Sequence, residues 1–273
     1  MEQNLKLIVF SDLHYAPVRP VNNGSRIDRK LTDLALPILD KLIPEINNTK
    51  PDVAIFCGDY VEDFNNMEED IKNLTFVWNK LKEIKVPFYG CVGNHDLRSM
   101  QHRTQVEQIL GYNHSTFSFD VNGYHLIVLG TEVDNSKGCS DGGILKTQFI
   151  SESDLSWLEQ DLNKTNYPCL IFTHFGLGTD SMKGNWWFHD NPDHAVLGNA
   201  EKVKQILIKS NKVLSVFSGH QHWTKKLVEN GITYYVVGSL TEDMCQNGIP
   251  DGVYFEVEVK NGEVNVIEKH IKL

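Results

Sequence analysis

Short apolar runs recur along this chain, and each ends abruptly in polar residues. The runs are rich in β-branched and aromatic residues and are bounded by turn-forming residues, which is the pattern of buried β-strands. Five of them lie at residues 5–10, 51–58, 86–93, 168–173 and 213–219. The pattern therefore predicts five buried strands.

Between these runs, apolar residues follow a helical spacing. We expect helices at residues 28–47, 68–84, 152–164 and 199–210. In the first, Pro37 and Pro44 predict kinks or ends, because proline lacks the N–H that an inner helical turn requires. The third is preceded by Ser151, whose spacing from Asp154 is that of a capping pair. Alternating strands and helices predict the α/β class.

Asn-Gly pairs separate neighbouring β-like runs at residues 122–123, 230–231 and 261–262. This dipeptide favours the tight turn of a β-hairpin, because both residues tolerate positive φ. Antiparallel strands should therefore join the others, and we predict two packed mixed β-sheets flanked by helices. Residues 176–198 show no periodicity, and a loop of this length in a compact domain is usually functional or disordered.

The charge and length of the chain limit its partners. The formal net charge over 273 residues is −10, whereas proteins that bind duplex nucleic acid usually present a basic surface. We therefore expect no long nucleic acid as a partner; a small phosphorylated substrate fits if metal ions reverse the charge locally. Since no linker or repeat divides the chain, we predict a single domain of residues 1–273. The oligomeric state stays open.

Cysteine usage indicates a reducing compartment. Cys57 and Cys169 lie inside apolar runs, where a thiol behaves as a small hydrophobic group, and none of the five cysteines forms a C-x-x-C pair. The first residues do not form a signal peptide, and no apolar stretch approaches the ~20 residues that a membrane span needs. We therefore expect a cytoplasmic protein that does not bind membranes.

Potential metal ligands follow all five predicted strands. In open α/β sheets, ligands bind beyond the carboxyl ends of the strands, so these side chains should meet in one crevice. They are Asp12, His14, Asp59, Asn94, His95, His174, His220 and His222. A set of oxygen and nitrogen donors without sulfur suits Mn, Fe or Zn.

The local sequence also suggests how these side chains are aimed. Residues two apart in an extended chain point the same way, so we expect extended backbone at residues 12–14 and 220–222. Gly58, Gly93 and Gly219 precede three of the ligand groups. Glycine lets a chain turn sharply and lets backbone approach an ion closely.

In chain order, the residues form the motifs D-x-H, G-D, G-N-H-D, a histidine at a strand end, and G-H-x-H. The set resembles the calcineurin-like metallophosphoesterase family from residue 5 to about residue 240. The resemblance implies a four-layer sandwich, two mixed sheets between helices, that hydrolyses phosphate esters with two divalent metal ions. It also implies that a water molecule made acidic by the ions attacks phosphorus in line.

The resemblance further implies a role for each residue. Two groups of ligands would share Asp59: one ion would be bound by Asp12, His14, Asp59 and His222, the other by Asp59, Asn94, His174 and His220. His95 would be the catalytic residue, either donating a proton to the leaving oxygen or neutralising charge on the phosphoryl group.

Two positions depart from the family's pattern. The family often has G-D-x-x-D, whose second aspartate hydrogen-bonds the catalytic histidine, whereas this chain has Glu62 there, followed by Asp63. The residue that orients His95 is therefore open, and the protein-phosphatase branch becomes less favoured. T-H-F-G replaces the frequent H-H-P, which leaves His174 as the one histidine of that motif.

Flanking segments favour the phosphodiesterase-like branch. "DLSWLEQDL" resembles the Q-x-x-W-L-x-x-x-L of such members, and "LGNAEKV" resembles their L-x-N-A-x-x-V. In residues 176–198, Trp186 and Trp187 are candidates for binding an organic leaving group, and His189 and His194 for contacting phosphate. We therefore predict a hydrolase of small organic or nucleotide phosphodiesters. A phosphomonoesterase or protein phosphatase on the same site and a catalytically silent metal-binding scaffold are the alternatives.

Overall fold

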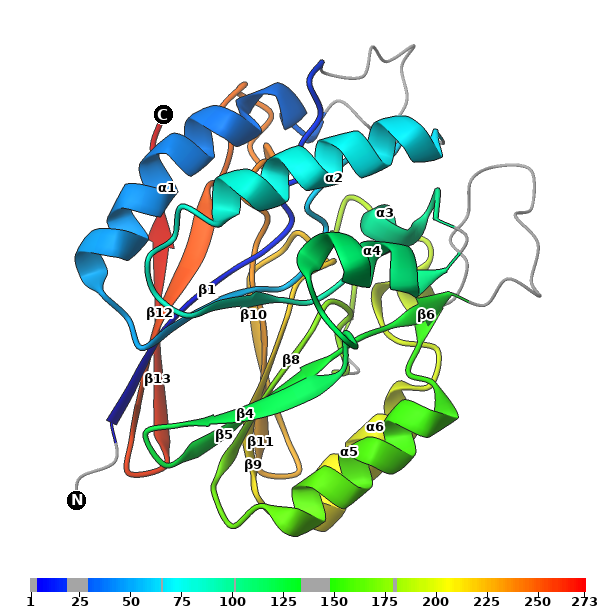
Figure 1. The fold of residues 1–273 in the computed structure, drawn as a ribbon, viewed down its shortest axis with the longest axis vertical. Helices are drawn as coiled ribbons and strands as arrows, with labels where there is room; N and C mark the ends of the chain where they lie inside the picture. The colour runs from blue at the N-terminus through cyan, green and yellow to red at the C-terminus, as the bar shows by residue number, and fades with distance from the viewer. Residues whose placement is uncertain (1–3, 19–28, 65, 101, 134–147, 179–180) are drawn as a thin grey trace.

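Two β-sheets pack face to face, and helices cover the outer face of each (Figure 1). The strand orders are β13-β12-β1-β2-β3 in the first sheet and β10-β11-β9-β8-β5-β4 in the second, and β6 pairs with β7 alone. The computed structural model describes residues 4–18, 29–64, 66–100, 102–133, 148–178 and 181–273. Of the five cysteines, Cys139 lies outside these ranges.

The predicted strands and hairpins are all present. The first sheet consists of β1 (Asn4–Phe10), β2 (Val53–Phe56), β3 (Phe88–Gly90), β12 (Val253–Lys260) and β13 (Glu263–His270). The second consists of β4 (Phe117–Val121), β5 (Tyr124–Leu129), β8 (Cys169–Thr173), β9 (Val213–Ser218), β10 (Lys225–Glu229) and β11 (Ile232–Val236). The short pair is β6 (Glu132–Val133) and β7 (Gln148–Phe149).

The helices are α1 (Ala35–Thr49), α2 (Met67–Leu81), α3 (Asn94–Leu97), α4 (Arg103–Leu110), α5 (Glu152–Lys164) and α6 (Ala200–Ser210). Two short 3₁₀ turns are η2 (Thr32–Leu34) and η3 (Pro192–Ala195). As predicted, Ser151 caps α5, and its Oγ accepts a hydrogen bond from the Asp154 backbone N–H at 3.1 Å.

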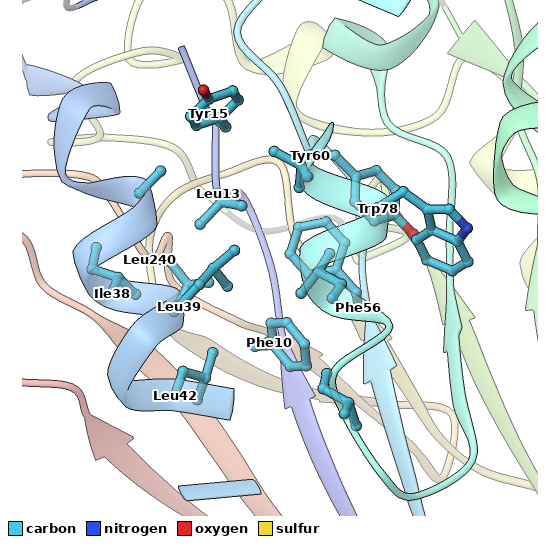
Figure 2. Close-up of a cluster of buried hydrophobic side chains, with 14 of the residues drawn as sticks. Phe10, Leu13, Tyr15, Ile38, Leu39, Leu42, Phe56, Tyr60, Trp78 and Leu240 are labelled. Atoms are coloured by element: carbon cyan, nitrogen blue, oxygen red, sulfur yellow. The ribbon is translucent and has the colours of Figure 1, made fainter. Parts of the chain in front are cut away.

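The apolar strands are explained by burial on both faces. In β1, Ile8 and Phe10 face the layer of α1 and α2, whereas Leu7 and Val9 face the second sheet. Figure 2 shows the first of these clusters, with Phe10 opposite Leu42 of α1. A third cluster joins the outer face of the second sheet to α5 and α6. Three apolar interfaces between four layers confirm the α/β sandwich.

Parallel pairing brings the functional strand ends to one edge. β1, β2 and β3 are mutually parallel neighbours, and so are β5, β8 and β9. The backbone N–H of Asp12 donates to the Gly58 carbonyl at 3.0 Å, and that of Gly219 donates to the His174 carbonyl at 3.0 Å. These bonds join the segments after β1 and β2 and those after β8 and β9.

The three hairpins have the predicted turns. Asn122, Asn230 and Asn261 have φ of 51°, 51° and 50°, and the glycine after each also has positive φ. Both central residues of a type I′ turn need such values, which explains the Asn-Gly pairs.

The first predicted helix is partly wrong. Its first residues are not helical: Lys30 forms a β-bridge with Glu242, and the Leu31 N–H donates to the Thr241 carbonyl at 2.9 Å. These long-range bonds override the local helical pattern. Pro44 neither ends nor begins the helix but lies inside α1 on its exposed face, where water can satisfy the carbonyl that its ring leaves free. Within the described residues, no helix has the length and apolar character needed to cross a bilayer.

Candidate metal centre

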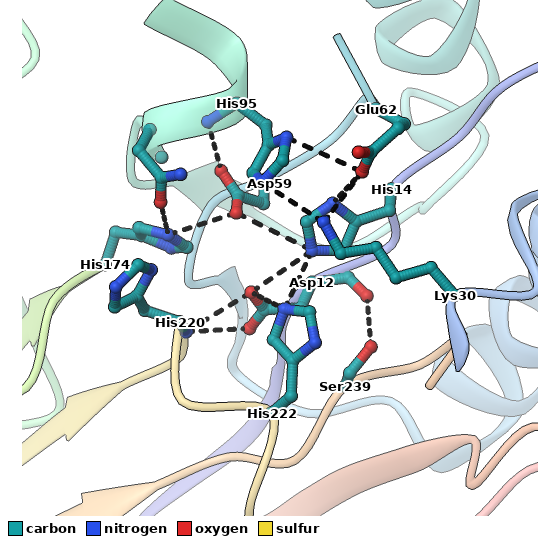
Figure 3. A network of polar contacts seen from close by, with 12 residues as sticks. Asp12, His14, Lys30, Asp59, Glu62, His95, His174, His220, His222 and Ser239 are labelled. Carbon is teal, nitrogen blue, oxygen red and sulfur yellow. Dashed lines mark hydrogen bonds and ion pairs between the residues drawn. The ribbon is translucent and has the colours of Figure 1, made fainter. Parts of the chain in front are cut away.

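All seven predicted metal ligands and His95 come together at the shared edge of the two sheets (Figure 3). Two groups of potential ligand atoms, each within 4.8 Å, consist of Asp12, His14, Asp59 and His222, and of Asp59, His174 and His220. Asn94 joins the second group, because its Oδ1 lies 3.0 Å from Nε2 of His174. All of these side chains are buried.

The backbone that aims these residues is not extended, so that part of the prediction is wrong. Asp12 and His14 have φ of 55° and 46°, and His220 and His222 have φ of 66° and 51°. Left-handed conformation costs a residue with a Cβ about 1–2 kcal/mol. Such strain recurs at functional sites when the surrounding structure holds it in place, and here it turns successive side chains toward a common centre.

The glycines serve two different purposes. Gly58 has φ of 95°, so it supplies the sharp turn before Asp59. Gly93 has an ordinary φ of −96°, but a Cβ there would lie 2.8 Å from Cγ of Asp59. Gly219 is required for the same reason, since a Cβ there would collide with the side chains of Ser11 and Asp12.

Asp59 has a free carboxylate oxygen at the middle of the site. Its Oδ1 accepts a hydrogen bond from the His95 backbone N–H at 2.8 Å. Its Oδ2 is buried and accepts no hydrogen bond from the described residues, and it lies 3.6 Å from His14 and 3.3 Å from His174. An orphaned buried carboxylate oxygen is unfavourable unless a cation binds it.

Each ligand imidazole has one nitrogen occupied by a neighbouring acceptor. His174 lies 2.7 Å from the Cys57 carbonyl, and His220 lies 2.9 Å from the His194 carbonyl. His14 lies 2.9 Å from the Glu62 carboxylate, and His222 lies 2.9 Å from the Glu242 carboxylate. The Glu62 contact is at ion-pair distance without hydrogen-bond alignment. Histidine ligands in metal sites are held in this way, with one nitrogen at an acceptor and the other available to the metal.

Two of these ring nitrogens face each other. Nε2 of His14 lies 2.9 Å from Nε2 of His222, and both rings direct their other nitrogen at a carboxylate. Each nitrogen can bind a cation through its lone pair, so a bound metal ion would take the place of a proton between them. The residues present therefore fit a divalent metal.

The carboxylates favour positive charge on the imidazoles. Burial lowers the pKa of His174, but the Asp59 carboxylate raises it to about 10. Burial likewise lowers the pKa of His222, but Asp12 outweighs it and raises the pKa to about 9. A site that stabilises charge on two imidazoles also stabilises a metal ion, which displaces those protons on binding.

His95 lies on one side of the ligands, and two carboxylates approach Nδ1 of its ring without hydrogen-bond alignment. Its Nδ1 is 2.6 Å from Oδ1 of Asp63 and 3.5 Å from Glu62, so Asp63 is the close carboxylate. Glu62 instead contacts His14. Nε2 of His95 faces Lys30 Nζ at 3.1 Å and Arg98 Nη2 at 3.3 Å. Burial, and then the charges of Arg98 and Lys30, hold the pKa of His95 well below its ordinary value.

The two predicted tryptophans are placed differently. Trp187 is half-buried beside His222, and its Nε1–H donates to Oε1 of Glu242 at 3.2 Å. Trp186 is 39% exposed, and the Arg29 guanidinium carbon lies 4.0 Å from its ring centre. Trp186 is thus the more accessible surface for a ligand.

The two predicted histidines of the same segment have local partners. His189 is exposed, and its Nδ1 accepts a hydrogen bond from the Gly184 N–H at 2.9 Å. His194 contributes its backbone carbonyl to His220.

Sequence reasoning missed Lys30 and Glu242. Lys30 is buried, and its Nζ lies 2.9 Å from Glu62. Glu242 is fully buried and accepts from both Trp187 and His222. Neither lies in a motif, and Lys30 falls in a segment with a helical pattern, so no local signal was available.

Comparison with known proteins agrees with this fold. A family model described as calcineurin-like phosphoesterase matches residues 5–224. The chain therefore belongs to the calcineurin-like phosphoesterase family, and it is a metal-dependent hydrolase of phosphoric esters. This confirms the resemblance carried by the strand-end motifs.

Individual relatives are distant in sequence. A protein of Xenorhabdus bovienii described as a "probable cyclic nucleotide phosphodiesterase" is 24% identical over 238 residues, covering 84% of this chain and 83% of the relative. A dimetal phosphatase from Danio rerio superposes with a TM-score of 0.70 at 16% identity, over 97% of this chain and 98% of that one. A purple acid phosphatase from yellow lupin seeds superposes with a TM-score of 0.63 at 15% identity, over 99% of this chain and 52% of that one. The two structures share the fold.

Proposed function

We propose that this protein is a dinuclear hydrolase that acts by preference on small organic or nucleotide phosphodiesters. One ion would be bound by Asp12, His14, Asp59 and His222, the other by Asp59, Asn94, His174 and His220. The observation that carries the proposal is the orphaned Oδ2 of Asp59, which belongs to both groups of ligands. A carboxylate between two cations reduces their mutual repulsion.

The charge of the site supports two ions rather than one. Five carboxylates contact its imidazoles: Asp12, Asp59, Glu62, Asp63 and Glu242. Only Lys30 and Arg98 contact the same imidazoles with positive charge, among the described residues. With neutral imidazoles, the site has an excess of three negative charges, which one divalent ion leaves unbalanced. Two divalent ions give an excess of one positive charge, which matches the single charge of a phosphodiester.

Divalent ions bound at these residues supply Lewis-acid chemistry, polarising phosphoryl oxygens and making a water molecule acidic. The protein's own groups do the rest. Asp63 lies 2.6 Å from Nδ1 of His95, and Nε2 of that ring faces the side where Arg98 is partly exposed. From there, we propose, His95 stabilises charge on the phosphoryl group, or donates a proton to the leaving oxygen when Nε2 carries one.

Two observations favour diesters over monoesters. The relative in Xenorhabdus bovienii is described as a cyclic nucleotide phosphodiesterase. Trp186 is partly exposed and adjoins Trp187, which contacts His222, so it offers a surface for a second organic group. Stacking of a base on an aromatic ring contributes about 1–3 kcal/mol. A phosphomonoesterase on the same site is the second candidate, because Lys30 adds positive charge that the sequence motifs did not include.

The metal requirement is tested by chelation and metal analysis. Removing the ions should abolish turnover, and Mn should restore it. Asp59→Asn should lower occupancy at both sites, because the bridging oxygen becomes an amide. Two tightly bound ions per chain in this variant would contradict the bridging role, and full turnover by chelated, metal-analysed protein would exclude a metal enzyme. Turnover of no phosphoester by the Mn-loaded wild type would favour the silent scaffold.

The substrate preference is tested with two matched chromogenic compounds. We expect kcat/KM for bis(p-nitrophenyl) phosphate to exceed that for p-nitrophenyl phosphate in the Mn-loaded protein. Trp186→Ala should raise KM for the diester more than for the monoester, with unchanged metal content. A clear preference for the monoester would refute the diester proposal and favour the phosphomonoesterase.

We also propose a reducing, cytoplasmic location. Cys57, Cys91 and Cys169 are free and buried. Cys57 and Cys91 form no disulfide even though they follow the neighbouring strands β2 and β3. Fractionation of the native host with an antibody tests this, and recovery from an oxidising compartment would exclude it.

A further inference from the structure

Two positively charged side chains converge on one neutral nitrogen beside the metal ligands. Lys30 Nζ lies 3.1 Å and Arg98 Nη2 lies 3.3 Å from Nε2 of His95. They come from distant parts of the chain: Lys30 is bridged to Glu242, and Arg98 directly follows α3. Figure 3 shows Lys30 reaching the network from the side opposite His174.

This arrangement has more donors than acceptors. Lys30 has one close carboxylate partner, Glu62 at 2.9 Å, and Arg98 has one, Asp63 at 2.8 Å. Each directs a further N–H toward His95. When Nε2 of His95 is the acceptor, it offers a single lone pair, which accepts one hydrogen bond. Among the described residues, the two side chains therefore compete for this one acceptor, and Lys30 also lies 5.2 Å from the ring centre of Trp187.

The position of the surplus donor suits an anion that arrives from outside. The ring centres of His95 and His14 are 4.7 Å apart, so the two cations lie beside the first group of candidate metal ligands. Lys30 is almost fully buried, whereas the Arg98 side chain is 34% exposed, which gives access from solvent on that side.

We propose that Lys30 and Arg98 together bind the non-bridging oxygens of the substrate's phosphate group, which replaces Nε2 of His95 as their shared acceptor. The assignment rests on the proposed function, since it places the phosphate between this pair and the metal ligands. Charge-assisted hydrogen bonds from two directions fix the phosphate, and Nε2 of His95 is then no longer the acceptor of either donor. Both residues are thus substrate-binding residues for a phosphoryl group.

The test measures phosphate binding separately from turnover. Lys30→Gln and Arg98→Gln remove one charge each and retain a polar N–H for the carboxylate partner. Inorganic phosphate is titrated into Mn-loaded protein by calorimetry, and bound metal per chain is measured on the same samples. We expect each variant to keep its metal and to bind phosphate about 10- to 100-fold more weakly, the range for a charged hydrogen bond. Lys41→Gln is the control, since Lys41 lies on the surface and donates only to the Lys272 carbonyl among the described residues.

Each outcome decides the proposal. Unchanged phosphate affinity with metal retained in both variants overturns it. If Lys30→Gln loses metal through the Glu62–His14 contact, Arg98→Gln decides alone, because Arg98 makes no contact with that pair among the described residues. Metal loss in both variants also overturns the proposal, because Lys30 and Arg98 would then support metal binding rather than bind phosphate. Failure of the wild type to hydrolyse diesters would refute the proposed function and leave the phosphate-binding result standing.

Discussion

Replacing Gly93 by alanine tests how closely the two sheet-end segments must approach each other to form the centre. Gly93 lies directly before Asn94 and against Asp59. A Cβ at this position would lie 2.8 Å from Cγ of Asp59 and closer still to its Oδ1 and backbone nitrogen. The φ of −96° is available to alanine, so backbone strain is not the cause of the expected effect.

The size of the effect follows from these contacts. Ordinary contact of a Cβ begins at 3.4 Å, so the segments must separate by more than about half an ångström. Asp59 cannot yield freely, because its Oδ1 accepts from the His95 N–H at 2.8 Å and its own N–H donates to Asp96 at 3.0 Å. Overpacking of this kind costs about 1–3 kcal/mol. A displacement beyond ±0.2 Å exceeds what metal-ligand distances tolerate, so we expect both ions to be bound at least about tenfold more weakly.

Metal analysis after gel filtration and urea unfolding in the presence of chelator measure the two consequences separately. Gly262→Ala is the matched control: Gly262 has φ of 84° in the β12–β13 turn, and nothing lies within 4 Å of its added Cβ. Left-handed alanine there should cost about 1–2 kcal/mol without changing metal content. The reasoning is refuted if Gly93→Ala keeps two tightly bound ions and is no less stable than Gly262→Ala.

Three further perturbations follow from the site and its surroundings. His95→Asn should keep its metal but lower kcat by about 10²–10⁴-fold for substrates with poor leaving groups, measured by steady-state kinetics. Glu242→Gln should weaken the affinity for one ion by about 10–100-fold, measured by competition with a chelator, because the carboxylate orients a ligand imidazole at 2.9 Å. Far from the centre, burial lowers the pKa of His125, but hydrogen bonds and charge from Asp161 and Asp120 raise it above its ordinary value. Stability from this group is complete below the unfolded pKa of about 6.5 and is lost as pH rises through the folded value. Urea unfolding should therefore find His125→Asn destabilised at about pH 6 and much less so at about pH 9.

Each of these expectations has an outcome that contradicts it. If substrates with good leaving groups lose as much rate in His95→Asn, the proton-donor role is wrong and an electrostatic role remains. If Glu242→Gln binds each ion as tightly as the wild type does, Glu242 is not a positioning residue. Glu256→Gln, on β12, serves as the control. An equal loss of stability in His125→Asn at both pH values would show that packing rather than charge explains its contribution.

The sequence by itself determined the elements and the residue types of the site. Strand composition, the Ser151 cap and the Asn-Gly turns are local: each depends on neighbouring residues and on the φ that they tolerate, so the strands, the hairpins and α5 could be predicted. The ligand motifs were also readable, because carboxyl ends of parallel strands meet at one edge. The first helix was predicted poorly, since Lys30 is held by Glu242, more than two hundred residues away.

Only the tertiary structure decided how the site is oriented. The sequence left open whether Glu62 or Asp63 faces His95, and the distances of 3.5 and 2.6 Å to Nδ1 favour Asp63. Left-handed backbone at Asp12 and His14, not extended chain, turns both side chains inward, and that conformation is sustained by hydrogen bonds to the segment after β2. Such strain and such partners depend on segments that are far apart in the chain, so no local pattern encodes them; packing of the two sheets creates them.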